Sequence, residues 1–332
     1  MCGDAGVSVA HMRAAYASAI NPTDPLAGLT VGDIPEPATP DDWVTVRVVA
    51  SALNHHDLWS LRGVGLGENQ LPMILGCDAA GVDEDGNDVL IHSVIGDPAA
   101  TDETMDPKRT LLSEKWPGTH AERVRVPRRN LIAKPAELSF AEAACLPTAW
   151  LTAYRMLRVR GRLPEDGSVL VQGAGGGVAT AAVILAQALG ARVYATSRDV
   201  SKRERIAALG ATAIEPGARL PERVDVVIET VGEATFDHSL KAAKQGGRIV
   251  VSGATSGHLA KVDLRRVFFL QLEIVGSTMG TRDELAALAT LCVTRGIRPI
   301  IDSEYPFEDV RSAFAHLEDG DVFGKVVVRQ ET

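Results

Sequence analysis

The hydrophobic pattern of this 332-residue chain changes near residue 135. Before that point, short runs of β-branched residues alternate with polar ones, which is typical of strands with one buried face. The clearest run is WVTVRVVA at 43–50, which follows the proline-rich DIPEPATPDD. Similar runs predict strands at 12–18, 89–93 and 121–126. The first part of the chain is therefore predicted to be mainly β, after eleven residues without periodicity that we expect to form a loose extension.

Beyond residue 135, strand-like segments alternate with helix-like ones, beginning with helices within 138–157. The predicted strands are 169–173, 192–197, 224–230, 247–253 and 272–277, and the predicted helices are 178–189, 201–209 and 235–243. This alternation implies βαβ units and a parallel sheet covered by helices on both faces.

The chain is thus predicted to be an α/β protein with two domains. Residues 138–280 form the parallel-sheet domain. Two further helices, at 283–296 and 307–320, and a strand at 324–329 follow without a turn-rich linker. We therefore expect them to pack on the first domain, which would consist of residues 1–137 and 281–332.

A glycine-rich loop, GAGGGVA, connects the strand at 169–173 to the helix after it. Glycines there permit a tight turn and bring backbone N–H groups close to a pyrophosphate at the start of the helix. Val178 stands where the usual pattern has its third glycine, and the small residue Ala179 comes one position later. A glycine-rich turn without a ligand is the less favoured alternative. The residues assigned to the dinucleotide site are Gly173, Gly175, Gly176, Gly177 and Val178.

Basic residues follow the next strand, where the adenosine ribose of a dinucleotide is expected. An acidic residue there would bind the ribose 2′-hydroxyl of NADH, but the sequence has Ser197 and Arg198, with Lys202 and Arg203 one helical turn later. Arginine and lysine match a 2′-phosphate, so we predict NADPH as the cofactor. Asp199 leaves NADH open, and a solvated helix start is the alternative.

Composition restricts the possible partners. Lys and Arg total 34 against 43 Asp and Glu, a net charge of −9, and we find no basic stripe, so a nucleic acid is not expected. The longest apolar runs are too short for a membrane span, which predicts a cytoplasmic protein. Four cysteines lie far apart without a CxxC pair, so we expect reduced thiols: Cys2, Cys77, Cys145 and Cys292.

From Met12 onward, the chain resembles the medium-chain dehydrogenase/reductase superfamily, and within it the zinc-independent quinone oxidoreductase branch. The resemblance lies in eight segments that occur in the family's order: ALNHHDLWSLRG, LPMILGCDAAG, GTHAERVRVP, LSFAEAACLPTAWLTAYRML, VLVQGAGGGVA, VDVVIETVG, IVGSTMG and FGKVVV. It implies a GroES-like β-domain built from both chain ends, a Rossmann domain between them, an active site in the interdomain cleft, and a homodimer commonly formed through the Rossmann sheets.

The resemblance also implies further cofactor contacts. Thr148 is expected at the nicotinamide end and Lys325 near the mouth of the groove. The residues expected to line the groove are Thr230, Val231, Gly232, Ser252, Gly253, Ala254, Ser277, Thr278 and Met279.

The sequence does not predict a zinc site. Where zinc-dependent relatives have a cysteine before x-x-Asp and a His-Glu pair after a glycine, this chain has Asn54 and Cys77-Asp78. The segment 97–116, which corresponds to the structural zinc lobe, contains no cysteine. A set improvised from Cys77, Asp78 and one of the adjacent histidines stays open as the less favoured alternative.

Without a metal, the chemistry favours an acceptor that needs little activation, such as a quinone or an α,β-unsaturated carbonyl. Four residues are candidates for positioning the substrate and for proton transfer: Asn54, His55, His56 and Asp57. Asn54 could donate to a carbonyl or ribose, Asp57 could orient a loop, and one histidine could donate a proton while the other faces solvent. Trp59, Trp150 and Phe269 are candidates for an apolar pocket wall, although each also fits a core position.

We therefore predict an NADPH-dependent reductase of a small-molecule quinone or enone. The alternatives are a zinc-dependent alcohol dehydrogenase and a nucleotide-binding protein with little or no turnover. A dedicated fatty-acyl enoyl reductase is disfavoured. Enoyl thioester reductases of the same superfamily use a tyrosine shortly after the segment that contains Asn54 as proton donor, and none of the four tyrosines of this chain lies there: Tyr16, Tyr154, Tyr194 and Tyr305.

Overall fold

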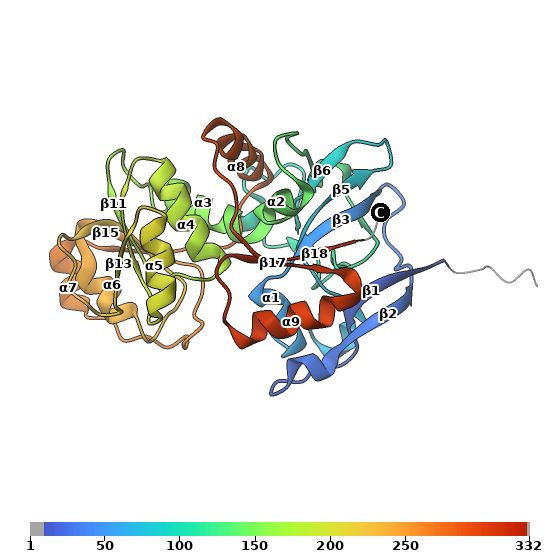
Figure 1. Cartoon of the computed structure of the whole chain (residues 1–332), viewed down its shortest axis with the longest axis horizontal. Helices are drawn as coiled ribbons and strands as arrows, with labels where there is room; N and C mark the ends of the chain where they lie inside the picture. Colours follow the sequence, from blue (N-terminus) through green and yellow to red (C-terminus); the bar gives the residue numbers. More distant parts are fainter. Residues whose placement is uncertain (1–9, 331–332) are drawn as a thin grey trace, which may run out of the picture. The chain divides into compact units, whose positions relative to one another are not determined.

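The computed structural model describes residues 10–330 and divides into two compact units (Figure 1). Among the described residues, unit 1 comprises 10–134, 304–320 and 327–330, and unit 2 comprises 135–303 and 321–326. Most of the extension expected at residues 1–11, together with Cys2, lies outside the described part. No helix within 10–330 is long and apolar enough to cross a bilayer.

Unit 1 is built mainly from antiparallel strands. In its larger sheet, β3 pairs antiparallel with β5, β9 and β18, and the order along the sheet is β10-β6-β5-β3-β18-β17. A three-stranded sheet has the order β2-β1-β4, and β7 pairs with β8. The strands are β1 (His11–Ala17), β2 (Leu29–Pro35), β3 (Val44–Ala52), β4 (Met73–Ile74), β5 (Asp78–Asp83), β6 (Asp88–Ile91), β7 (Val94–Ile95), β8 (Thr110–Leu111), β9 (Arg123–Val126), β10 (Leu131–Ala133), β17 (Ile301–Pro306) and β18 (Lys325–Arg329).

Two α-helices belong to unit 1, namely α1 (His55–Leu61) and α9 (Val310–Asp319). In α9, the buried residues are Val310, Ala313, Phe314 and Leu317. This spacing of three and four places them on one face, which explains why the segment folds as an amphipathic helix. Short 3-10 turns complete the unit: Pro25–Gly28, Glu68–Gln70, Glu103–Met105, Arg128–Asn130 and Phe307–Asp309.

Unit 2 contains a six-stranded parallel sheet with the order β13-β12-β11-β14-β15-β16. Its strands are β11 (Ser168–Val171), β12 (Arg192–Thr196), β13 (Thr212–Ile214), β14 (Val224–Glu229), β15 (Ala243–Val251) and β16 (Glu273–Gly276). The chain starts in the middle at β11, adds strands on one side, and then continues on the other side from β14. In such sheets, ligands bind outside the carboxyl ends of the strands at this reversal.

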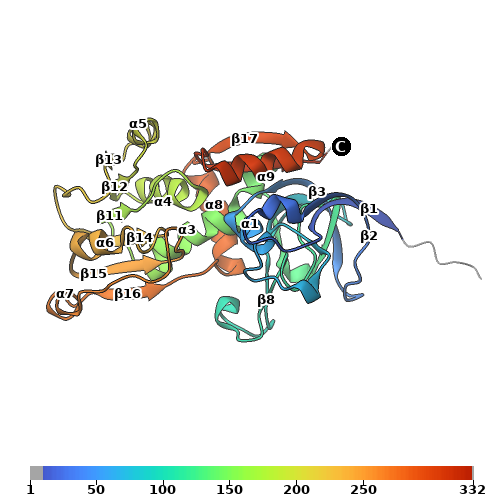
Figure 2. The ribbon, with the colours of Figure 1, turned by 90° about the horizontal axis from the view of Figure 1, so that it is seen from below.

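The helical segments of unit 2 are α2 (Phe140–Ala144), the π-helical stretches Leu146–Trp150 and Met156–Arg160, α3 (Leu151–Arg155), α4 (Gly177–Ala188), α5 (Val200–Ala208), α6 (Phe236–Ala242), α7 (Leu264–Leu270) and α8 (Arg282–Thr294). Figure 2 shows β15 and β16 side by side at one edge of the sheet, with α7 beside them.

The structure differs from the expected domain division at α8. This helix lies in unit 2, although the sequence predicted residues 281–332 with the first domain. One contact that joins α8 to this unit is an ion pair: the Arg155 guanidinium of α3, only 3% exposed, lies 2.8 Å from the Glu284 carboxylate of α8.

Candidate functional site

The loop between β11 and α4 has the backbone geometry of an anion-binding turn. Gly173 and Gly175 have φ angles of +66° and +153°, which side chains strain to adopt. A Cβ atom on Gly173 would lie 2.5 Å from Cγ2 of Val231, and one on Gly177 would lie 2.8 Å from Cδ of Lys325. Only glycine fits, and the start of the twelve-residue helix α4 presents N–H groups to a ligand.

The turn after β12 carries the basic residues predicted for the 2′-phosphate. Ser197 is buried and Arg198 is exposed, while Nζ of Lys202 lies 3.8 Å from a carboxylate oxygen of Asp321. Arg203 donates to the carbonyl oxygens of Ser197 and Arg198 at 2.8 and 3.1 Å and so shapes the turn.

Asp199, which left NADH open, is used as a helix cap. Its carboxylate accepts from the Lys202 backbone N–H at 2.9 Å and the Ser201 hydroxyl at 2.7 Å. These hydrogen bonds hold the pKa of Asp199 below its ordinary value. The carboxylate is thereby engaged with the first turn of α5.

The remaining predicted cofactor residues follow the carboxyl ends of neighbouring strands. Thr230 and Val231 follow β14; Ser252, Gly253 and Ala254 follow β15; Ser277, Thr278 and Met279 follow β16. Thr148 lies in the π-helical stretch Leu146–Trp150, and Lys325, 3% exposed, begins β18. The buried hydroxyl oxygens of Thr148 and Ser277 have no hydrogen-bond partner among the described residues. Together with the glycine turn, they fit a polar ligand such as a dinucleotide.

The segment that contains the candidate catalytic residues forms the start of α1. Asn54 precedes the helix, and its backbone N–H donates to the Asp57 carboxylate at 2.8 Å. Its side-chain amide donates to Asp78 at 2.9 Å and to the carbonyl oxygen of Ala52 at 3.4 Å. Both amide hydrogens thus have acceptors within the segment, and Asn54 orients its neighbours; donation to a substrate carbonyl or to the ribose stays a prediction.

The two adjacent histidines lie in different environments. His55 is exposed, whereas the His56 side chain is 24% exposed. Nε2 of His56 lies 2.9 Å from the Glu114 carboxylate, and Nδ1 lies 3.6 Å from Sγ of Cys77. Burial opposes the charged form, but the sulfur of Cys77 and the Glu114 carboxylate hold the pKa of His56 well above its ordinary value.

The partners of His56 favour its charged form. Sγ of Cys77 donates to the carbonyl oxygen of Leu112 at 3.3 Å, and burial raises the pKa of this thiol. The Glu114 carboxylate accepts from Nε2 at 2.9 Å, whereas the direction of the contact between Nδ1 and Sγ depends on the tautomer of the ring. The raised pKa of His56 favours the imidazolium form.

Asp57 is fully buried and lies beside His120, another histidine that the sequence did not single out. The Asp57 carboxylate is 3.6 Å from Nε2 of His120, whose Nδ1 lies 2.9 Å from the Ser51 hydroxyl. Although burial opposes ionisation, His120 and the Asn54 N–H lower the pKa of Asp57. Asp57 thus anchors the start of α1.

The described residues do not fit zinc. Nowhere in 10–330 do three His, Cys, Asp or Glu side chains come together in a way that could hold a metal ion. In the segment where zinc was the alternative, the Asn54 side chain donates to Asp78, and Sγ of Cys77 donates to the carbonyl oxygen of Leu112.

The predicted aromatic wall is not formed. Trp150 is 1% exposed and belongs to the core of unit 2, whereas Phe269 of the same unit is 72% exposed on α7. The two side chains therefore do not line one pocket. Trp59 is 38% exposed in α1.

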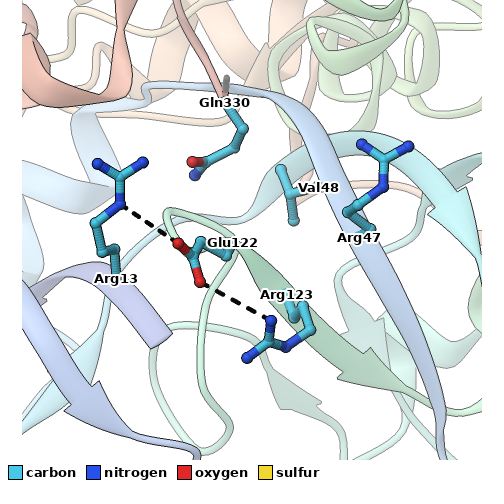
Figure 3. Close-up of a pocket in the computed structure, with 6 residues that line it drawn as sticks. All are labelled: Arg13, Arg47, Val48, Glu122, Arg123 and Gln330. Carbon is cyan, nitrogen blue, oxygen red and sulfur yellow. Dashed lines mark hydrogen bonds and ion pairs between the residues drawn. The ribbon is translucent and has the colours of Figure 1, made fainter. Parts of the chain in front are cut away.

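A separate pocket of about 310 Å³ lies in unit 1 (Figure 3). None of the predicted site residues lines it; the lining residues are Arg13, Arg47, Val48, Glu122, Arg123 and Gln330. Glu122 lies between two of the arginines, 3.3 Å from Arg13 and 3.9 Å from Arg123. Because those arginines also pair with Glu308 and Glu36, the pocket has little unbalanced positive charge for an anion.

Comparisons with known proteins agree with this geometry. Residues 40–136 match the family model described as alcohol dehydrogenase GroES-like domain, and residues 203–328 match the one described as zinc-binding dehydrogenase. The chain is 31% identical to the NADPH-dependent alkenal/one oxidoreductase, chloroplastic, of Arabidopsis thaliana, covering 88% of this chain and 73% of that protein. It is 28% identical to acryloyl-coenzyme A reductase of Sulfurisphaera tokodaii, over 92% of this chain and 97% of that protein.

A solved structure described as NAD-dependent alcohol dehydrogenase has a TM-score of 0.87 and 33% sequence identity, and the alignment covers 96% of this chain and 99% of that chain. The predicted combination of a GroES-like β-domain with a Rossmann-type parallel sheet is thus confirmed. The chain belongs to the medium-chain dehydrogenase/reductase superfamily of oxidoreductases, as its sequence motifs predicted.

Proposed function

We propose that this chain is an NADPH-dependent reductase of α,β-unsaturated carbonyl compounds and quinones, with His56 as the proton donor and without zinc. The observation that carries the proposal is the position of the His56 ring, whose nitrogens contact the Glu114 carboxylate at 2.9 Å and the Cys77 sulfur at 3.6 Å. The similarity to an alkenal/one oxidoreductase and an acryloyl-coenzyme A reductase supports the same acceptor class.

The cofactor residues are those of unit 2. The N–H groups at the start of α4 bind the pyrophosphate, and Arg198 and Lys202 bind the 2′-phosphate. Thr148 and Ser277 offer their buried hydroxyls to the nicotinamide half. When bound, NADPH supplies the hydride from C4 of its nicotinamide ring.

Addition of hydride to the β-carbon of an enone leaves negative charge on the carbonyl oxygen, and that oxyanion needs a hydrogen-bond donor and finally a proton. His56 supplies both. Its Nδ1 lies 3.6 Å from the Cys77 sulfur, which is the longer of its two contacts, and the proposal takes this contact as the one that a substrate oxygen replaces. Asn54 and Asp57 hold α1 in place through their mutual hydrogen bond. A quinone follows the same course: conjugate addition of hydride to a ring carbon leaves an enolate oxygen, which accepts the proton. A proton then moves from that ring carbon to the second carbonyl oxygen and gives the hydroquinone.

Stopped-flow oxidation of NADPH with a panel of enones, quinones and simple ketones tests this function. We expect turnover with enones or quinones, a slower reaction for His56→Gln, and an unchanged one for the exposed control His55→Gln. NADPH binding without turnover of any acceptor would contradict the proposal. Metal analysis of the active protein tests the zinc-free part, because a stoichiometric metal whose removal abolishes activity would refute it.

We also propose that the protein forms a homodimer through the edge of the parallel sheet in unit 2. β16 is the last strand at that edge, and apolar side chains are exposed on it and on the adjacent α7: Leu264 (70%), Phe268 (61%), Phe269 (72%) and Ile274 (43%). An exposed strand edge beside such a patch is suited to antiparallel pairing with a second copy.

A further inference from the structure

Buried polar side chains connect the loops that follow β12, β11 and β14 in one continuous chain of hydrogen bonds. We propose that this chain, anchored on Glu229, sets the relative positions of the cofactor loops, which makes Glu229 a positioning residue for dinucleotide binding. This inference rests on the proposed function, because it takes these loops as the cofactor site.

The chain begins at the glycine loop. The backbone N–H of Gly173 donates to Oγ1 of Thr196 at 2.9 Å, and that hydroxyl donates to Oε1 of Gln172 at 2.9 Å. Nε2 of Gln172 donates to Oγ of Ser239 at 3.0 Å, and Ser239 donates to Oε2 of Glu229 at 2.6 Å. These four side chains have no exposed surface. Each hydroxyl therefore has its donor and acceptor roles fixed by its neighbours.

The chain ends at the loop after β14. Oε1 of Glu229 accepts from the backbone N–H groups of Val231 at 2.9 Å and Gly232 at 3.0 Å, and from the Thr235 hydroxyl at 2.8 Å. Gly232 has a φ of +90°, so this turn depends on its glycine. These partners are uncharged groups that donate to Glu229, and a buried carboxylate is the acceptor that can satisfy them together.

The connected loops also contact each other. A Cβ atom added to Gly173 would overlap Cγ2 of Val231, so any displacement of the turn after β14 changes the space beside the glycine loop. Apolar residues would pack this region without the cost of desolvating a carboxylate. The network lies at the carboxyl ends of three adjacent strands, which is where doubly wound sheets bind their ligands. A requirement for fixed positions of the ligand-binding loops explains why polar side chains are buried there.

Substitution of Glu229 tests the anchor. In Glu229→Gln, the new NH₂ group faces groups that are themselves donors, so at least one of them loses its acceptor. We expect the Kd for NADPH, measured by protein-to-nicotinamide energy transfer, to rise about tenfold. The KM for NADPH should rise in parallel, whereas kcat at saturating NADPH and the KM for the acceptor stay within about twofold. NADH binding should weaken by the same factor, because these loops contact the part that both cofactors share.

Two milder variants test whether the network acts as a unit. Thr196→Val and Ser239→Ala each remove one hydroxyl, and with it two hydrogen bonds of the network, at nearly constant volume. Thr104→Val, which removes a buried hydroxyl from unit 1, is the matched control. We expect each network variant to raise the Kd about three- to tenfold, and the double variant to bind no more weakly than the poorer single one.

Three outcomes would overturn the inference. The first is an unchanged Kd in folded Glu229→Gln, or in the milder variants if Glu229→Gln does not fold. The second is strict additivity in the double variant, and the third is a loss confined to NADPH. If the unaltered protein binds neither dinucleotide, the proposed function fails and the inference fails with it, whereas normal binding with unaffected variants refutes the inference alone.

Discussion

Glu114→Gln is the sharpest test of the proton donor, because it removes the charge beside His56 while keeping a hydrogen-bond acceptor of the same shape. The carboxylate oxygen lies 2.9 Å from Nε2 of His56. Two charges about 4 Å apart interact by about 4 kcal/mol at an effective dielectric constant near 20 and by about 1 kcal/mol in water. The side chains of His56 and Glu114 are 24% and 34% exposed, so their interaction energy lies nearer the value in water. A loss of about 1 to 2 kcal/mol lowers the proton-binding constant of His56 roughly tenfold.

The assay is kcat/KM for an enone at saturating NADPH, measured across about pH 5 to 10. A donor whose pKa is raised is fully protonated at low pH and loses its proton as pH rises through that pKa. We therefore expect a plateau at low pH and a fall at high pH, with the fall in Glu114→Gln about one pH unit lower than in the unaltered protein. The control Glu84→Gln removes a surface carboxylate that pairs with Arg128 and should leave the profile in place.

A pH profile that does not move in Glu114→Gln would refute the role of Glu114 in holding the proton. A His56→Gln protein with the original kcat and the original profile would refute His56 as the donor altogether. The two results have different meanings. An unmoved profile in Glu114→Gln leaves His56 as the donor but shows that a group other than Glu114 raises its pKa.

Three further predictions follow from the remaining contacts. The double substitution Arg198→Glu and Lys202→Glu should weaken NADPH binding about tenfold or more and leave NADH nearly unaffected; equal losses for both cofactors, measured by titration, would contradict the 2′-phosphate site. Arg155→Met leaves a largely buried carboxylate without its cation and should lower the free energy of unfolding by about 3 kcal/mol in urea titration, whereas Arg128→Ala at the surface should not change it measurably. Phe269→Asp should convert the proposed dimer to monomers in sedimentation, and an unchanged mass would place the interface elsewhere.

The parallel-sheet domain could be predicted from the sequence because its signals are local. The glycines that the turn requires lie directly between a strand and a helix, and each strand is a short apolar run. Short elements gave weaker signals: β13 has three residues, and α7 buries none of its seven. The helix α1 was missed although Asn54 and Asp57, three residues apart, form the reciprocal contact typical of a helix start.

The environment of His56 could not be predicted, because its partners come from distant parts of the chain. Glu114 is 58 residues away and Cys77 is 21 residues away. Neither separation matches a helical or hairpin spacing, so no periodicity associates these residues. The histidine pair could be recognised as a candidate, but only the fold shows which ring is turned toward a carboxylate. The same holds for Glu229, whose partner Ser239 is ten residues away on the next helix.

Each unit contains an ionisable side chain in polar surroundings, and these surroundings differ between Glu229 and His56. In unit 2, the buried carboxylate of Glu229 is surrounded by neutral donors, so its charge orients hydroxyl and backbone dipoles and is not transferred. In unit 1, the His56 ring, which is 24% exposed, contacts the Glu114 carboxylate at 2.9 Å and the Cys77 sulfur at 3.6 Å. In the proposed mechanism, the shorter contact keeps the ring charged, and a developing oxyanion replaces the longer one. The ring proton would then do for the oxyanion what a Lewis acid does in zinc-dependent relatives. On this proposal, the position in which those relatives have a cysteine is free for Asn54, whose side chain donates to Asp78 and Ala52.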